Sequence, residues 1–380
     1  RPCIKMPQWS PSSAFPDIER LFPGRILFEL QRTINEPQSE PQEVRMKRRL
    51  RSIATIILFG ASLALLLGFL SSVHPAFDSF AHFRVHLAVL TVAIALPLLF
   101  TPERLLALSA LVFAVTSFSS ILPFMHVPMV PAAAFAPKPA DSAVYRLLEI
   151  NLRYNNPTPE KVLSLIGRIQ PDVVTLTEVG SMWEEKLALL KQAYPHQLIC
   201  PRIRQPFGVA ILSRRPLDES RETRCPARLS LAVAPVDFGG TTIDVGAIHL
   251  GWPWPWPQAR QIFRLEPHLA DLGDDAIVAG DLNAAPWSAA AAGVAKAGGL
   301  MLIPSPGPTW IHRLLPKALL FAGLPIDNVF AKGNVIVHSS ERLEDVGSDH
   351  VPLLVEFSVR PSSDKPEDEQ ESATVVLTQP

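Results

Sequence analysis

The sequence carries almost no net charge. Its 35 Lys and Arg residues and 36 Asp and Glu residues give a formal charge of −1. A chain with so small a charge creates no long-range field that would attract nucleic acid. Any anionic substrate must therefore be bound by a local group of side chains.

Cysteine is scarce, with three residues in the chain. Cys3 lies near the start, while Cys200 and Cys225 lie on either side of the apolar run FGVAILS. None of the three has the spacing of a metal cluster. In an oxidising compartment Cys200 and Cys225 could form a disulfide, and two free buried thiols agree with the sequence equally well.

Long apolar runs are abundant, and they raise the mean hydropathy to +0.20. The first, IATIILFGASLALLLGFLSS, follows Met46 and the basic segment KRRLRS. It has the roughly 20 residues that a bilayer-spanning helix needs. No clear Ala-x-Ala site follows it, which argues against a cleaved signal peptide. This run therefore predicts a transmembrane helix.

Two further apolar runs, Val85–Phe100 and Arg104–Phe124, are separated only by Thr101–Glu103. They predict a helical hairpin. A soluble helical core could be as apolar, but three such runs in the first third of the chain favour a membrane anchor. The basic residues before the first run should remain cytoplasmic, so three crossings place the chain after residue 125 outside. We expect a multi-pass protein of the inner membrane with a periplasmic domain.

Composition divides the chain into five segments. We expect a poorly structured, Pro-rich leader over residues 1–45, with Met46 as the candidate natural start, and a three-helix transmembrane anchor over 46–125. A Pro- and Ala-rich linker over 126–143 suits a semi-rigid spacer between the bilayer and the next domain. Residues 144–360 alternate short apolar runs with turn residues and include one amphipathic pattern, TPEKVLSLIGRIQ, which predicts an α/β domain. Residues 361–380 are charged and predict a disordered tail.

Polar residues recur where the predicted strands begin or end. Each alone is typical of a turn or of a structural hydrogen bond, but their coincidence at one kind of place favours a shared site at the rim of a sheet. They are Asn151, Glu178, His249, Asp281, Asn283, Asp327, Asp349 and His350.

In this order the motifs resemble those of the endonuclease/exonuclease/phosphatase superfamily. These metal-dependent phosphoesterases include pancreatic deoxyribonuclease, abasic-site endonucleases, inositol-polyphosphate phosphatases and neutral sphingomyelinases. The resemblance covers Tyr145–Val359, and AGDLN and GSDH are its more specific motifs. It implies a deoxyribonuclease-like four-layer αββα sandwich with the active site at the rim of two packed sheets, here preceded by three transmembrane helices.

The resemblance and the chemistry of phosphoester hydrolysis together assign roles to these residues. Glu178, with Asn151 and Asp349, is expected to bind Mg²⁺, with Mn²⁺ as a substitute. Asp281 would orient the attacking water and Asn283 would donate to the phosphate. The catalytic set also includes His350, paired with Asp327, and His249 as a second imidazole. Candidate substrate-binding residues are Arg153, Arg260 and Trp310. Arg264 could also bind phosphate, Arg260 and Gln261 are the weaker candidates, and Thr309 could line the pocket with Trp310.

Some features depart from the common family pattern. TLTEV lacks the Gln that often precedes the Glu, and PIDNVF has Asn328 where nucleases frequently carry an aromatic residue. Both departures argue against a DNA substrate. The segment HLGWPWPWPQARQ after His249 could stack on bases, bind a sugar, enter the bilayer interface, or only brace its own loop.

The sequence thus predicts a membrane-anchored, metal-dependent phosphoesterase. Its partners would be membrane lipid, through the three helices, and a phosphoester, which could be nucleic acid, a lipid head group or a small phosphate ester; no obligate protein partner is evident. The alternative is a catalytically silent membrane-tethered binding module of the same fold. A small transporter is disfavoured because the three apolar runs carry almost no charge.

Overall fold

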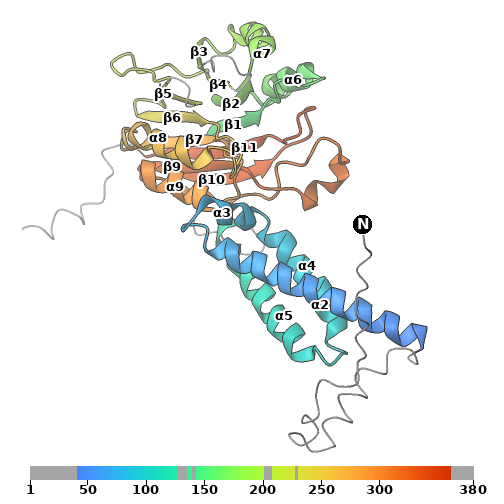
Figure 1. Ribbon diagram of the computed structural model, residues 1–380. Coiled ribbons are helices and arrows are strands. Elements are labelled where there is room, and N and C mark those ends of the chain that lie inside the picture. Colours follow the sequence, from blue (N-terminus) through green and yellow to red (C-terminus); the bar gives the residue numbers. More distant parts are fainter. Residues whose placement is uncertain (1–40, 127–134, 139–142, 201–207, 227–229, 361–380) are drawn as a thin grey trace, which may run out of the picture. The chain divides into compact units, whose positions relative to one another are not determined.

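The computed structural model describes residues 41–126, 135–138, 143–200, 208–226 and 230–360 (Figure 1). The chain divides into two compact units, residues 1–57 and 58–380. In the first unit the described residues belong to the beginning of helix α2 (Gln42–Phe69), where Lys47 forms an exposed ion pair of 2.7 Å with Glu43. The helix thus begins inside the segment predicted as a leader. Residues 1–40 lie outside the described part of the chain.

The apolar runs fold into helices. After α2 come α3 (Pro75–His82), α4 (Arg84–Leu98), α5 (Arg104–Ser119) and the short 3-10 helix η2 (Leu122–Phe124). As predicted, α4 and α5 pack side by side as a hairpin. In the described residues, Gln42–Phe69 and Arg104–Phe124 are long and apolar enough to cross a membrane. A third span requires α3 and α4 to act together as one span bent by 63°, so the three-helix anchor stays a prediction.

Two mixed β-sheets form the centre of the second unit. The six-stranded sheet has the order β10 (Val335–Arg342), β11 (Leu353–Val359), β1 (Tyr145–Asn151), β2 (Val173–Val179), β4 (Gly208–Ser213), β3 (His196–Cys200). The five-stranded sheet has the order β5 (Leu231–Asp237), β6 (Thr242–Ile248), β7 (Ala276–Asp281), β9 (Asp327–Lys332), β8 (Met301–Leu302). Each sheet contains one parallel pair, β1 with β2 and β6 with β7.

Helices connect and cover these sheets. They are α6 (Pro159–Ile169), α7 (Ser181–Leu187), η3 (Ala188–Leu190), α8 (Gln258–Ala270), α9 (Ala289–Gly298) and η4 (Lys317–Ala322). The parallel pairs require crossover connections, which α6 supplies between β1 and β2 and α8 between β6 and β7 (Figure 1).

Three apolar clusters hold the layers together. Residues of both sheets, such as Leu147 and Val245, share one cluster, which therefore lies between the sheets. Leu148 faces the other way and packs with Trp183 of α7, so β1 is buried on both faces. On the far face of the second sheet, Leu265 of α8 joins a third cluster. The prediction of an α/β fold with two packed sheets is confirmed.

Helix α6 illustrates how the sequence specifies its elements. Pro159 occupies the first turn, where its missing N–H costs nothing. Val162, Leu165 and Ile166 recur at helical spacing and are buried. Gln170 ends the helix in the left-handed conformation, with φ of 50°.

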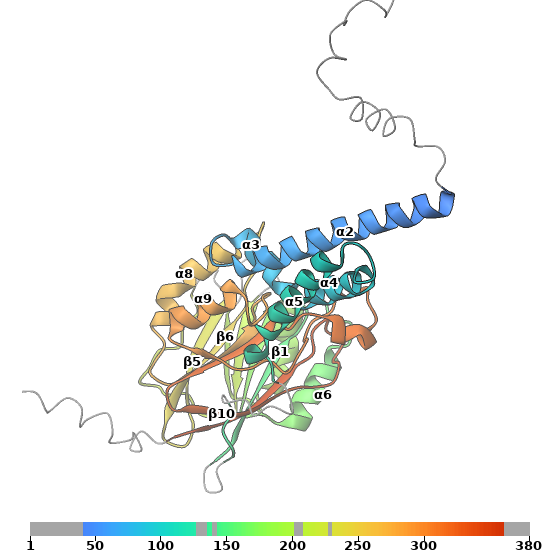
Figure 2. The same ribbon diagram turned by 90° about the horizontal axis from the view of Figure 1, so that it is seen from below.

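Helix α3 docks on the α/β domain, a contact that the sequence did not predict. The Asp78 carboxylate accepts hydrogen bonds from the backbone N–H groups of Ala289 and Ala290, at 2.8 and 3.0 Å. These are the first residues of α9, so Asp78 caps that helix from a distant part of the chain. The Trp287 indole donates to Ala81 O at 2.6 Å. Figures 1 and 2 both show α3 against α9.

The described residues of the predicted linker also contact the domain. His126 N donates to Ser305 O at 2.8 Å, and Ala136 N donates to Val337 O at 3.1 Å. Phe135 packs against the cluster between the sheets. These contacts are not those of a free spacer, because parts of the segment follow the domain surface. The predicted tail, 361–380, lies outside the described residues.

A disulfide answers the question that the cysteine spacing left open. Cys200 at the end of β3 is bonded to Cys225, with their Cα atoms 5.5 Å apart. Next to Cys225, Arg224 pairs with Val233 of β5. The bond therefore links an edge strand of the first sheet to a segment that runs beside the second.

Candidate active site

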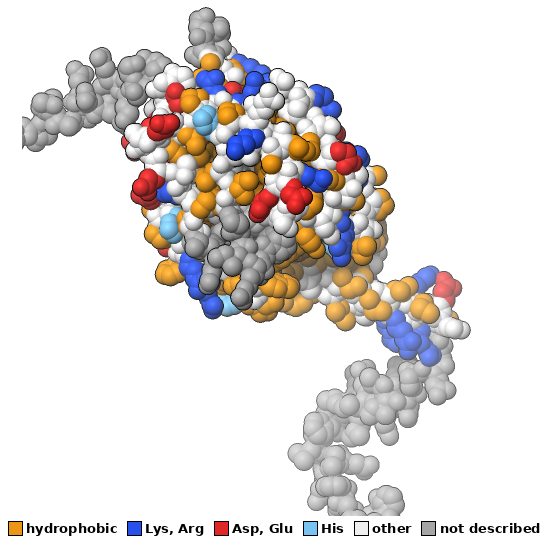
Figure 3. Space-filling view, turned by 90° about the horizontal axis from the view of Figure 1, so that it is seen from above, with side chains coloured by type: hydrophobic (Ala, Val, Ile, Leu, Met, Phe, Trp, Pro, Cys, Tyr) orange, Lys and Arg blue, Asp and Glu red, His pale blue; other side chains and the backbone are white. Residues whose placement is uncertain are grey.

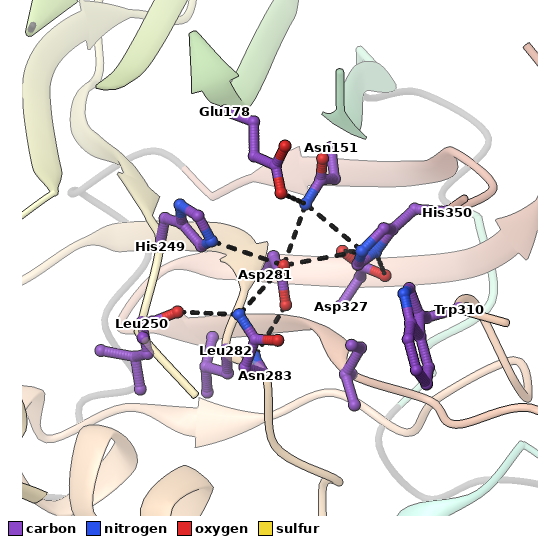
Figure 4. Close-up of polar contacts among 12 residues, drawn as sticks. Asn151, Glu178, His249, Leu250, Asp281, Leu282, Asn283, Trp310, Asp327 and His350 are labelled. Carbon is purple, nitrogen blue, oxygen red and sulfur yellow. Dashed lines mark hydrogen bonds and ion pairs between the residues drawn. The ribbon is translucent and has the colours of Figure 1, made fainter. Parts of the chain in front are cut away.

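The strand ends meet at one rim of the two sheets, and seven of the predicted residues meet there (Figure 4). Asn151 ends β1, Glu178 lies near the end of β2, His249 follows β6 and Asp281 ends β7. Strand β9 runs antiparallel to β7, so its first residue, Asp327, pairs directly with Asp281. Asn283 and His350 complete the group.

Asp281 is the centre of this group, and its Oδ2 atom has four nitrogen neighbours. Asn151 Nδ2 donates to it at 2.9 Å and Asn283 Nδ2 lies at 3.4 Å. His249 Nε2 and His350 Nε2 lie at 3.6 and 3.7 Å. The neighbours come from both sheets, so this carboxylate marks the point where the sheets share polar contacts.

The turn after β7 explains how a buried strand delivers a carboxylate and an amide. Gly280 has φ of 155°, and a Cβ atom there would overlap the Ile248 carbonyl oxygen, so only glycine fits. Asn283 is left-handed at φ of 48°. Its backbone N–H donates to Asp281 Oδ1 at 2.7 Å and its Nδ2 donates to Leu250 O at 2.9 Å. The tight turn thereby fixes both side chains.

His350 and Asp327 form a buried pair. The imidazole Nδ1 lies 2.8 and 3.1 Å from the two Asp327 oxygens, and both side chains are less than 5% exposed. Asp327 is held in turn by its own backbone, because its N–H and that of Ile326 donate to Thr309 Oγ1 at 3.2 Å. Asp327 therefore orients the ring and leaves Nε2 facing the rim.

Glu178 and Asn151 come together on the first sheet. The β2–β4 register shifts between Leu176 and Val179, and Glu178 is left-handed at φ of 56°, so a bulge turns its carboxylate to the rim. Its Oε2 accepts from Tyr154 N at 2.9 Å, and its Oε1 lies 3.5 Å from Asn151 Nδ2. Asn151 Oδ1 accepts from Arg153 N at 2.9 Å.

His249 is braced by Gln261, a weaker sequence candidate. Gln261 Nε2 donates to His249 O at 2.8 Å, and its Oε1 accepts from Gly251 N at 2.8 Å. The amide thus bonds to the backbone on both sides of Leu250, at the start of the loop that follows β6. Gln261 positions the histidine and does not itself line the polar cluster.

Burial and mutual charge shift the acidities of the group. Burial raises the pKa of Asp281 to about 8, with His350 opposing the rise and Asp327 adding to it. For His350, burial alone would lower the pKa, but the carboxylates of Asp327 and Asp281 outweigh it and raise the pKa to about 10. Burial also raises the pKa of Glu178. Such shifts in one cluster are typical of catalytic sites.

The charge balance of the cluster fits a divalent cation. The carboxyl groups of Glu178, Asp281, Asp327 and Asp349 lie within electrostatic reach of one another, with the imidazoles of His249 and His350 among them. Oxygen donors of this kind are the ligands of Mg²⁺ and Mn²⁺. Ligand atoms of Asp281, Asp327 and His350 lie within 4.8 Å of one another. The predicted ligands Glu178, Asn151 and Asp349 lie beside this trio rather than in it, and their assignment stays a prediction.

Three other predicted residues, Trp310, Asp349 and Arg153, lie at or near the edge of the cluster. Trp310 is half-buried, its indole N–H lies 3.4 Å from Asp349 Oδ2, and its ring meets Trp252 edge-on at 5.8 Å. Arg153 is half-buried and left-handed, and its Nε donates to Asn155 at 3.0 Å. Arg260 lies exposed on α8, and within the described chain no hydrogen bond or ion pair joins it to the cluster.

Two ionisable residues near the cluster were missed by the sequence analysis. Glu149 is fully buried, and among the described residues neither of its oxygens has a hydrogen-bond partner. Burial and then the charge of Asp327 raise its pKa well above the usual value. Lys317 lies 3.7 Å from Asp345 and within electrostatic reach of Asp349 and Arg153. Glu149 had a sequence signal, since a strand repeats every two residues and it lies two before Asn151.

Comparison with known proteins gives one family match. The sequence model described as the endonuclease/exonuclease/phosphatase family matches residues 148–350. No curated protein matches the chain by sequence.

Solved structures give matches over 57% of this chain. An endonuclease/exonuclease/phosphatase from Beutenbergia cavernae is 20% identical over 72% of its chain, with a TM-score of 0.44. One from Bacteroides vulgatus is 16% identical over 100% of its chain, with a TM-score of 0.47. Sphingomyelinase C from Streptomyces griseocarneus is 18% identical over 99% of its chain, with a TM-score of 0.41.

Proposed function

Because the chain belongs to the endonuclease/exonuclease/phosphatase family, we propose that it is a membrane-anchored, metal-dependent hydrolase of a phosphodiester or phosphomonoester. Members of this family are generally hydrolases that act on phosphoesters. The observation that carries the proposal is the convergence of four nitrogen atoms on Asp281 Oδ2, beside the His350–Asp327 pair.

Each side chain has its own role in the attack of water on phosphorus. Asp281 is the general base, because two donors hold its carboxylate in place beside the His350–Asp327 pair and burial raises its pKa to about 8. His350 donates from Nε2 to a phosphoryl oxygen, with its ring charge stabilised by Asp327. His249 and Asn283 offer further donors from the second sheet. Attack of water at phosphorus breaks the ester P–O bond, and the leaving oxygen gains a proton.

A divalent cation would be held by the carboxylates of Glu178 and Asp349 at this rim, beside Asn151. When bound, it would act as a Lewis acid that neutralises phosphate charge. The excess of carboxylates over cationic side chains in the cluster supports this part of the proposal.

The apolar helices support membrane attachment, and the basic residues in the first turns of α2 support a cytoplasmic N-terminal side. The Cys200–Cys225 disulfide supports an oxidising compartment, and hence a periplasmic domain. On the face of the molecule in Figure 3, acidic, basic and hydrophobic side chains are interspersed, which suits local rather than long-range binding of the substrate.

The test uses the full-length protein in detergent micelles. Bis(p-nitrophenyl) phosphate and p-nitrophenyl phosphate are assayed with Mg²⁺, with Mn²⁺ and with EDTA. We expect cation-dependent turnover of at least one ester, which His350→Ala abolishes and Asp274→Asn, at an exposed position, retains. Binding of Mg²⁺ without turnover of these or other phosphoesters would instead favour the silent binding module.

A further inference from the structure

An apolar cavity of about 710 Å³ lies beside the catalytic domain, at the ends of the apolar helices. Val85, Val89 and Ala93 of α4 line one wall, and Ile121 lies at the end of α5. Phe321 and Leu324 of the domain line another wall. Among the described residues that line it, His82, His86 and His126 carry imidazoles and Trp287 an indole N–H that is bonded to Ala81 O, while the others have no polar side-chain atom. Such a space favours a hydrocarbon occupant over water or a polar ligand.

The cavity wall is shared with the candidate active site. Leu324 and Trp310 exchange backbone hydrogen bonds of 2.9 and 3.0 Å, and Trp310 also pairs with His350. Pro308 and Pro325 of the lining lie one and two residues from Thr309 and Asp327. Two residues of extended chain span about 7 Å. A ligand that fills the cavity therefore has its polar end near the phosphoesterase site.

Exposed apolar residues continue from the cavity on both sides of the site. The segment before β9 exposes Leu314, at 80%, and Phe321, at 76%. The loop after β6 exposes Trp252, Trp254 and Trp256, at 49, 51 and 60%. This exposure argues against the reading in which the tryptophans only brace their own loop, and it is typical of side chains at a bilayer interface.

Both apolar segments are tied to the helices that form the proposed anchor. His86 Nε2 of α4 lies 2.8 Å from Ala322 O, at the rim of the cavity. Ser79 of α3 donates to Trp254 O at 3.3 Å. The Trp252–Trp310 ring contact at the edge of the site is therefore flanked by segments that contact apolar helices.

Cationic groups lie where a head group would be. Lys317 belongs to the same apolar segment, and its ammonium is within electrostatic reach of Asp349 and Arg153. The long Lys317 side chain can keep its charge at the polar site while the neighbouring leucines remain in an apolar phase. Lys317 and Arg153 thus supply the local positive charge that the neutral chain as a whole lacks.

We propose that the cavity receives an acyl chain of a membrane phospholipid whose phosphoester group lies in the site. The inference rests on the proposed function and specifies its substrate class. The phospholipid is bound at two places, with hydrocarbon beneath the Trp310–Leu324 pair and phosphate at the Asp281–His350 rim. Hydrolysis follows the proposed chemistry, so water enters and the cleaved ester leaves as an alcohol and a phosphate.

The test reconstitutes the full-length protein in vesicles of phosphatidylglycerol and phosphatidylethanolamine. A phosphatidylglycerol carrying a diazirine within one acyl chain is photolysed, and the labelled peptides are mapped by mass spectrometry. Ala93→Trp fills the cavity, while Val112→Trp adds the same side chain to an exposed position of α5 outside the lining. We expect adducts on residues 85–93 or 321–325, which Ala93→Trp depletes and Val112→Trp retains.

A second measurement compares hydrolysis of phosphatidylglycerol in the vesicles with that of bis(p-nitrophenyl) phosphate. Ala93→Trp should lower the ratio of the two rates roughly tenfold, because chain binding contributes only to the lipid reaction. An unchanged ratio of the two rates, or adducts spread evenly over the exposed face of α5, overturns the cavity proposal. Neither result contradicts the proposed phosphoesterase function. Adducts at the cavity with no hydrolysis of either ester keep the lipid site and overturn the proposed function.

Discussion

At the scale of single residues, the site combines unusual backbone with buried charge. Arg153, Glu178 and Asn283 all have left-handed φ angles near 50°. Non-glycine residues rarely adopt this conformation, and it persists only where the surroundings enforce it. In each case the conformation places a carboxylate, an amide or a backbone N–H at the rim. The strain is therefore concentrated where the chemistry is proposed.

Removing the charge of Asp327 should uncouple the buried pair. Asp327→Asn keeps the shape of the side chain but loses the charge that raises the pKa of His350. We expect kcat for bis(p-nitrophenyl) phosphate to fall by about 10³-fold. Far-UV circular dichroism should remain that of the parent, and Asp274→Asn serves as the control. If the variant kept the parental kcat, Asp327 would have no part in the mechanism.

Gly280→Ala tests the turn that delivers Asp281. A methyl group would overlap Ile248 O and would also strain a φ of 155°. We expect a loss of about 3 kcal/mol in the free energy of unfolding, together with lost activity. Gly167→Ala is the matched change, because a Cβ in the middle of α6 has nothing within 4 Å. Chemical denaturation of both variants should separate them, and equal stabilities would contradict the account.

Glu149 makes stability depend on pH. Its pKa is raised in the folded state, so its contribution to stability is complete below about 4.5 and is lost as pH rises toward the raised value. Glu149→Gln removes this loss. The variant should gain melting temperature relative to the parent as the pH increases from 5 to 8. A difference independent of pH would contradict this assignment, and Glu185→Gln, at an exposed position on α7, is the control.

Much of the site followed from residue types at strand ends. The order of Asn151, Glu178, Asp281 and His350 predicted one rim, and they meet there. The position of Lys317 was not predictable, because its approach to Asp349 depends on how a long segment before β9 folds back. Arg260 was predicted from its place near His249 in the sequence, but it lies exposed on α8, and among the described residues no hydrogen bond or ion pair joins it to the cluster.

At the scale of elements, α3 attaches the apolar helices to the catalytic domain. Asp78 satisfies two N–H groups of α9, and Ser288 Oγ accepts from Ala291 N at 3.1 Å. The first turn of α9 is therefore capped from two sides. Buried Arg84, at the start of α4, bonds to Gly68 O and Ser120 Oγ at 3.2 and 3.3 Å, which ties the ends of α2, α4 and α5 together.

The two caps of α9 offer a matched comparison. Asp78→Ala and Ser288→Ala each remove a cap contribution of about 1 kcal/mol. By hydrogen–deuterium exchange, both should loosen the first turn of α9. Only Asp78→Ala should also raise exchange in α3, because among the described residues the Ser288 hydroxyl bonds within α9 and not to that helix. Equal exchange of α3 in the two variants would show that Asp78 does not hold the docking.

Periodic elements could be predicted, whereas docking could not. The spacing of Val162, Leu165 and Ile166 identified α6, and the apolar runs identified the α4–α5 hairpin. Helix α3 has mixed polarity and only eight residues, so no run or period marks it. Its purpose depends on the N-terminus of a helix more than 200 residues away, which local patterns do not encode.

At the scale of the whole molecule, the disulfide closes a loop across the sheets. Cys200 and Cys225 are separated by 25 residues, a loop for which the entropy model gives about 3.5 kcal/mol of stabilisation. The paired substitution Cys200→Ser with Cys225→Ser should lower the unfolding free energy by about this amount. Denaturant titration of the protein in detergent, with and without reductant, measures it.

The same bond reports on topology in the cell. If the domain is periplasmic, thiol labelling of whole cells without reductant should leave Cys200 and Cys225 unmodified, and labelling should appear after reduction. Strong labelling before reduction would place the domain in the cytoplasm. Cys3 lies outside the described residues, so a Cys3→Ser background keeps the readout to the pair.

The attachment of α3 to α9 has a kinetic consequence under the proposed topology. An enzyme that stays docked on its own anchor meets lipid by lateral diffusion, and its encounters take place in two dimensions. Its velocity should then follow the mole fraction of phospholipid in the surrounding bilayer. Adding an uncleavable lipid to the vesicles would slow it, whereas diluting the same vesicles in buffer would leave the turnover of each molecule unchanged.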